Sequence, residues 1–171
     1  MKALTVDFDL IAQSMHDLSR LTSDYYLDKN SGKILALSRS LINSLEKESD
    51  ERDAVPQWDA SMIPVVREIV LSGSQKYIRV PEAFGCPEHK WMADFLPQIS
   101  SFKLKQKLFQ TLRGRGACRR FKAILKDYEE EFSAWHKFRS LRWQERIQSW
   151  LESVGILAVG VSPKKLRATN K

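Results

Sequence analysis

The chain has 171 residues, enough for one domain with a hydrophobic core and short for two. Hydrophobic residues make up 43% of it, which excludes an intrinsically disordered chain. The net charge of +7 is uneven, because residues 102–171 carry 17 Lys and Arg against 6 Asp and Glu, whereas residues 1–101 carry 11 against 15. A basic half attracts phosphate, nucleic acid, anionic lipid or an acidic protein, although the two halves could equally neutralise each other.

The sequence predicts a cytoplasmic protein without a membrane anchor. No apolar run approaches the roughly 20 residues that span a bilayer. Asp7 and Asp9 stand where the apolar segment of a signal peptide would lie. In a reducing compartment we expect the two cysteines, Cys86 and Cys118, to be free thiols.

The first elements predicted along the chain are a helix and a β-hairpin. Asp7 can cap a helix whose apolar residues follow at helical spacing: Phe8, Ile11, Met15 and Leu18. Residues 25–28 and 33–37 predict two strands, and Gly32 in their connection can adopt a positive φ.

Residues 38–80 predict weaker elements. A helix through Leu41 and Leu45 is only faintly indicated, and the charged residues 46–53 predict a solvated loop or helix end. Pro64 suits the first turn of a helix that Gly73 would end. Residues 76–80 alternate as a third strand, which Pro81 closes.

The remaining residues predict four helices. The first ends near Pro97, the second begins at Ser100 or Ser101, the third begins at the Gly114–Gly116 turn, and the fourth runs from about Glu130 to Val154. We therefore expect an α+β fold in which a small antiparallel sheet of about three strands packs on a mostly helical C-terminal half. Residues 1–160 would form a single domain, and residues 161–171 a basic, disordered tail.

The segment from Leu112 to Lys122 is the most informative one, since it holds four arginines, a lysine and two glycines but no acid. A glycine turn that opens a basic helix can bind an anion, because free N–H groups and the helix dipole point at the same place. The same pattern also fits an ordinary connection between two helices.

Two basic faces are predicted on the last two helices. Arg115, Arg119, Lys122 and Lys126 share one face of the third helix, where Glu129, Glu130 and Glu131 could pair with them. On the fourth helix, Trp135 shares a face with three arginines and could stack on a guanidinium. The resulting candidate anion site is Arg113, Gly114, Arg115, Gly116, Arg119, Lys122, Trp135, Arg139, Arg142 and Arg146. Such arginines more often hold salt bridges to neighbouring helices.

No catalytic residue, metal site or cofactor is predicted. The three histidines lie far apart, and Cys86 with His89 lacks a second pair of zinc ligands. No phosphate-binding glycine loop is present. Asp24 could join Asp7, Asp9 and Asp28 near one end of the sheet, although a helix cap and a turn explain two of these acids.

A family resemblance covers the chain from about Asp7 to Ile156. The residues that carry it are Tyr25–Asp28 with Gly32, Tyr77–Pro81, Trp91–Phe95, Leu112–Ala117, Arg119–Lys122, Trp135, Phe138 with Arg139, and Trp150 with Leu151. In order and spacing they resemble the bacterial Uncharacterised Protein Family 0158, with Cys118 in place of an aromatic residue, usually Phe. The resemblance implies a bacterial, cytosolic, single-domain protein. It implies no site residue, because the family has no established activity.

Three functions remain open from the sequence. The first is a non-enzymatic binding module whose basic helical surface takes an anionic partner, nucleic acid before an acidic protein surface. The second is a protein-interaction or regulatory adaptor whose arginines are structural and paired within the chain. The third and least supported is an enzyme, which would need a pocket that gathers Arg113, Arg115, Tyr26 or His136 near a buried carboxylate. The sequence does not predict an oligomeric state.

Overall fold

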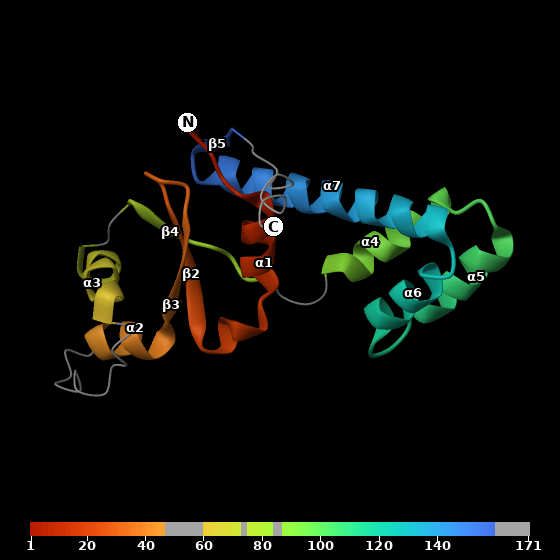
Figure 1. Ribbon diagram of the computed structural model, residues 1–171, viewed down its shortest axis with the longest axis horizontal. Helices are drawn as coiled ribbons and strands as arrows, with labels where there is room; N and C mark the ends of the chain where they lie inside the picture. Colours follow the sequence, from red (N-terminus) through yellow and green to blue (C-terminus); the bar gives the residue numbers. More distant parts are fainter. Residues whose placement is uncertain (47–59, 73–74, 84–86, 160–171) are drawn as a thin grey trace, which may run out of the picture. The chain divides into compact units, whose positions relative to one another are not determined.

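The structure, a computed structural model, describes residues 1–46, 60–72, 75–83 and 87–159. These residues contain seven α-helices, a three-stranded antiparallel sheet and a parallel pair of strands (Figure 1). The expected α+β fold with a mostly helical C-terminal half is thereby confirmed. The chain divides into two compact units, residues 1–82 with 147–171 and residues 83–146. The expectation of one domain over residues 1–160 stays a prediction, and the expected tail lies outside the described residues.

The first unit is built on the sheet β3-β2-β4, whose strands are Ser23–Asp28 (β2), Ile34–Ser38 (β3) and Tyr77–Arg79 (β4). Both neighbours of β2 are antiparallel to it, so the predicted hairpin and third strand are confirmed. Gly32 has a φ of 74° in the hairpin connection. A Cβ atom there would lie 2.0 Å from the carbonyl oxygen of Thr5, so the turn requires glycine.

Three α-helices pack on this sheet, namely Phe8–His16 (α1), Arg39–Glu46 (α2) and Ile63–Ser72 (α3). Short 3-10 helices, Leu18–Leu21 (η1) and Ala60–Met62 (η3), follow α1 and precede α3. Figure 1 shows α2 and α3 on one side of the sheet and α1 on the other. The core between the sheet and the helices α2 and α3 is formed by Tyr26, Leu37, Leu41, Ile42 and Val66.

Strands Lys2–Leu4 (β1) and Ile156–Ala158 (β5) form a parallel pair that the sequence did not predict. Lys2 pairs with Ile156 in this register, and Figure 1 shows the N-terminal segment beside β5. Gly155 precedes β5 with a φ of 77°, which confirms it as the residue that ends the long last helix.

The second unit contains Pro87–Phe95 (α4), Leu96–Gln98 (η4), Phe102–Thr111 (α5), Ala117–Leu125 (α6) and most of Glu129–Ser153 (α7). The four predicted helices are confirmed, with ends within a few residues of those expected. Residues of α7 from Ile147 onward belong to the first unit.

An aromatic cluster forms the core of the second unit. The Trp135 side chain is fully buried, with its ring 5.3 Å from that of Phe95 and 5.1 Å from that of Phe121. A second edge-to-face pair joins Trp91 to Trp143 at 5.1 Å. Because aromatic side chains bury large apolar areas, these two clusters hold α4, α6 and α7 together.

Candidate anion-binding surface

The connection between α5 and α6 is built by local capping. Ser101 caps the start of α5, where its hydroxyl accepts a hydrogen bond from the amide of Leu104 at 3.3 Å. Gly114 and Gly116 both have a φ of 76°, a left-handed conformation that strains other residues. Gly116 is the N-cap of α6, so the two glycines act as helix punctuation.

Arg120 holds this connection in place, a role that sequence analysis did not assign to it. Its guanidinium donates to the carbonyl oxygens of Thr111, Arg113 and Arg115. A ring nitrogen of His89 lies 2.6 Å from the carbonyl oxygen of Leu112. Carbonyl groups at the end of α5 and in the connection are therefore satisfied within the second unit, which gives the segment a defined conformation.

Three arginines around this connection are exposed to solvent: Arg113, Arg115 and Arg119. We call this group the arginine loop. None of their side chains forms an ion pair or hydrogen bond to another residue of the described part of the chain. Their charges are thus available to a ligand, as the first functional hypothesis requires.

Lys122 and Arg139 of the predicted site are instead paired internally. Glu88 is buried in α4 and receives Lys122 Nζ at 2.7 Å on Oε2 and Arg139 Nη2 at 2.6 Å on Oε1. Burial acts to raise the pKa of Glu88, but the hydrogen bonds from Lys122 and Arg139 outweigh it and hold that pKa below its ordinary value. The partner of Lys122 is thus Glu88 and not the acidic start of α7.

The predicted basic face of α7 is not a continuous binding surface. Trp135 is fully buried, so it cannot stack on a guanidinium or a base at the surface. Arg142 pairs with Glu145 at 3.1 Å and lies over the ring of Phe138. Arg146 is exposed and forms no ion pair with the described residues. The structure brings Lys122 and Arg139 together on one carboxylate and leaves the arginine loop and Arg146 as the accessible, unpaired cations of the predicted site among the described residues.

The segment that carries the arginine loop is strongly basic. Residues 95–126 contain nine Lys and Arg and no Asp or Glu. Besides the arginine loop, the exposed cations are Lys103 and Lys107 on α5, Arg120 on α6, which is bound to backbone carbonyls, and Lys126 after α6. With no acid in the segment to compensate them, these charges create a positive local potential.

A groove of about 740 Å³ lies beside the arginine loop within the second unit. Its walls come from α4, η4 and α5, and Arg113 lines it from the arginine loop. Phe102 and Phe109 of α5 also line the groove and are 72% and 53% exposed. Helical periodicity alone did not identify these two rings as surface residues. No carboxylate lines this groove.

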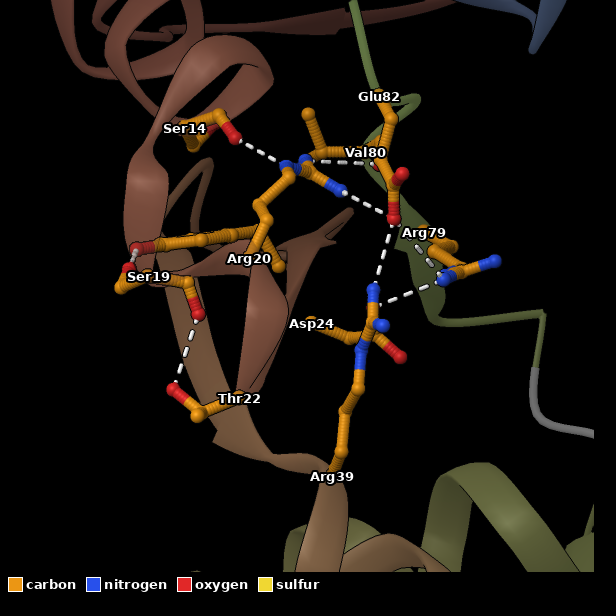
Figure 2. Close-up of polar contacts among 10 residues, drawn as sticks. Ser14, Ser19, Arg20, Thr22, Asp24, Arg39, Arg79, Val80 and Glu82 are labelled. Carbon is orange, nitrogen blue, oxygen red and sulfur yellow. Dashed lines mark hydrogen bonds and ion pairs between the residues drawn. The ribbon is translucent and has the colours of Figure 1, made fainter. Parts of the chain in front are cut away.

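A second charged cluster, in the first unit, was also missed by sequence analysis. In Figure 2, Arg20, Arg39 and Arg79 converge on the carboxylates of Asp24 and Glu82. Arg39 lies 3.0 Å from Asp24 and 2.8 Å from Glu82, and Arg79 lies 2.8 Å from Asp24.

The burial of Arg20 determines how the charge of its guanidinium is stabilised in this cluster. The guanidinium of Arg20 is almost wholly buried and donates to the carbonyl oxygens of Ser14 and Val80 (Figure 2). Burial lowers the pKa of Arg20, and the nearby carboxylates of Glu82 and Asp24 counteract that effect. Asp24 thus does not gather with the other acids, and the cluster ties α1, β2, α2 and β4 together.

No metal site or membrane helix is present in the described ranges. Groups of three or more His, Cys, Asp or Glu placed to hold a metal ion are absent there. Equally, no helix in those ranges is long and apolar enough to cross a bilayer. The expectation of free thiols is wrong for Cys118, which is disulfide-bonded, while Cys86 lies outside the described residues.

Comparison with known proteins gives a family but no activity. The model of an uncharacterised protein family (UPF0158) matches residues 1–162. Neither a curated protein nor a solved structure matches the chain significantly. The chain therefore belongs to the uncharacterised protein family UPF0158.

Proposed function

We propose that this protein is a non-enzymatic binding module that takes a nucleic acid on the arginine loop of its second unit. The observation that carries the proposal is that Arg113, Arg115 and Arg119 are exposed and unpaired within the described part of the chain. Guanidinium groups bind phosphate through paired hydrogen bonds as well as charge. The helix-capping glycines and Arg120 hold the arginine loop in place before a ligand arrives, which lowers the entropy cost of binding.

A labelled 12-nucleotide RNA, titrated by fluorescence anisotropy at low salt, tests this proposal. Replacing all three residues of the arginine loop with glutamine should weaken binding by about tenfold or more, because each lost phosphate contact removes a counterion-release contribution. A matched control removes three cations of the first unit, K29Q, K33Q and R67Q, and should retain binding. Absence of RNA binding by the wild-type protein at low salt contradicts the proposal, as does equal weakening in both triple variants.

The second candidate is an adaptor in which the basic residues are structural. The ion pairs of Lys122 and Arg139 with Glu88, and of Arg142 with Glu145, support that function for those three cations. In that case the arginine loop would take an acidic protein surface. Binding to a labelled acidic peptide but not to RNA would favour this candidate.

A cytoplasmic location is part of the proposal. The state of Cys118 in cells tests it, because the cytosol keeps most thiols reduced. Cys118 that is still disulfide-bonded in cells whose thiols are trapped by alkylation before lysis would argue against this location.

A further inference from the structure

The groove beside the arginine loop has two exposed aromatic rings that the fold does not explain. Phe102 and Phe109 are seven residues apart on α5, so they lie on the same side of the helix, about 10 Å apart along its axis. Both remain largely exposed, although the same helix buries Leu104 and Leu108 completely in the core. Two large apolar side chains held in solvent beside one groove are typical of a binding surface.

The polar part of the lining identifies the chemistry of the ligand. Four of the nine lining residues are polar, namely Lys105, Gln106, Gln110 and Arg113. The two cations suit phosphates, and the two amides can both donate to and accept from base edges or a hydroxyl group. The other five lining residues are apolar, namely Ala93, Leu96, Pro97, Phe102 and Phe109. Both charged members are cations and no carboxylate lines the groove, so it fits an anionic ligand with flat apolar faces better than an uncharged amphipathic helix.

We propose that this groove binds single-stranded RNA, with unpaired bases stacked on Phe102 and Phe109 and phosphates held by Lys105 and Arg113. Duplex bases are stacked on one another and cannot offer a face to either ring, whereas RNA is commonly recognised through its unpaired bases. The amides of Gln106 and Gln110 match the 2′-hydroxyl, which both donates and accepts. This inference rests on the proposed function and assigns the groove and the arginine loop to one ligand, since Arg113 belongs to both.

Substitution of the two rings tests the inference. The variant F102A/F109A and the milder F102L/F109L are titrated with a labelled 12-nucleotide single-stranded RNA, with a duplex RNA of the same length and with single-stranded DNA of the same sequence. Removal of each ring should weaken binding of the single-stranded RNA roughly fivefold or more. Leucine should not restore it, because the aromatic face is lost. L141A removes another exposed apolar side chain of the second unit, which is 58% exposed on α7, and should bind as the wild-type protein does.

The outcomes separate this inference from the proposed function. If the arginine-loop variant loses RNA binding but F102A/F109A does not, the proposed function stands and the inference is wrong. The inference also fails if the ring substitutions weaken duplex and single-stranded RNA equally, or if single-stranded DNA binds at least as tightly as RNA. Ring-dependent binding of a labelled polyglutamate peptide in preference to RNA would assign the groove to an acidic protein. If the wild-type protein binds no nucleic acid at low salt, the inference and the proposed function both fail.

Discussion

Individual ion pairs distinguish the cations of this protein that are bound to a carboxylate from those that stay exposed and unpaired. Glu88 is buried, and its two oxygens face Lys122 and Arg139. Charged groups can stay buried when their charges and hydrogen bonds are matched. Lys122 and Arg139 therefore help to stabilise the second unit. The arginines of the arginine loop carry the same charge but pair with no carboxylate of the described residues.

Replacing Glu88 with glutamine should destabilise the protein near neutral pH. E88Q removes the buried carboxylate that pairs with Lys122 and Arg139, and we expect a loss of about 1–3 kcal/mol in the free energy of unfolding because both cations can still reach solvent. The pKa of Glu88 is lower in the folded protein than its ordinary value of 4.5. Its carboxylate therefore stabilises the fold above that value, and this contribution is lost as the pH falls through the folded pKa.

Urea unfolding at a series of pH values checks this prediction. The difference between wild type and E88Q should be largest near neutral pH and should shrink in acid, because protonated Glu88 is also uncharged. D94N removes an exposed carboxylate in the same helix, and its effect should stay within about 0.5 kcal/mol. A difference between wild type and E88Q that does not change with pH would show that charge pairing is not the cause.

At the scale of elements, the structure shows how far local patterns determine this chain. Caps and turns could be predicted because their signals are local, as with Asp7 before α1, Gly32 in the hairpin and the glycines between α5 and α6. The pair β1–β5 could not, because three-residue strands from distant parts of the chain have no local signature. Helical spacing placed Trp135 with the arginines of α7, yet only tertiary packing against Phe95 and Phe121 decides that it is buried.

The helix connection at residues 112–122 was predictable from its arginines and glycines, but the exposure and pairing of its cations were not. Glu88 could not be identified as the partner of Arg139 because 51 residues separate the two. Nothing in the sequence separates Arg120, which binds backbone carbonyls, from its neighbour Arg119, which has no such bond, and both are exposed.

Because Arg119 and Arg120 are adjacent, a comparison of their substitutions tests whether Arg120 stabilises the connection between α5 and α6. R120A removes the donor to three carbonyl groups, and we expect it to cost about 1–3 kcal/mol and to raise amide hydrogen exchange in residues 112–117. R119A changes the same charge in the same helix and should alter stability by less than about 0.5 kcal/mol. Equal effects of the two substitutions on exchange would mean that Arg120 does not hold the connection.

At the scale of the whole chain, charge is concentrated in the segment 95–126. Net charge alone does not identify a partner, because a basic segment can be neutralised by acids elsewhere in the same protein. The described ion pairs neutralise Lys122, whereas the arginine loop keeps its charge exposed. We therefore expect the affinity for RNA to depend on a few localised charges and not on the net charge of +7.

The salt dependence of RNA binding measures how many of those charges meet phosphate. For a single strand, the logarithm of the association constant falls against the logarithm of salt concentration with a slope of about −0.7 per phosphate contact. Replacing Arg113, Arg115 and Arg119 with glutamine should therefore make the slope shallower by about 2, whereas the first-unit control K29Q/K33Q/R67Q should keep the wild-type slope. An unchanged slope in the arginine-loop variant would contradict binding of phosphate at the arginine loop.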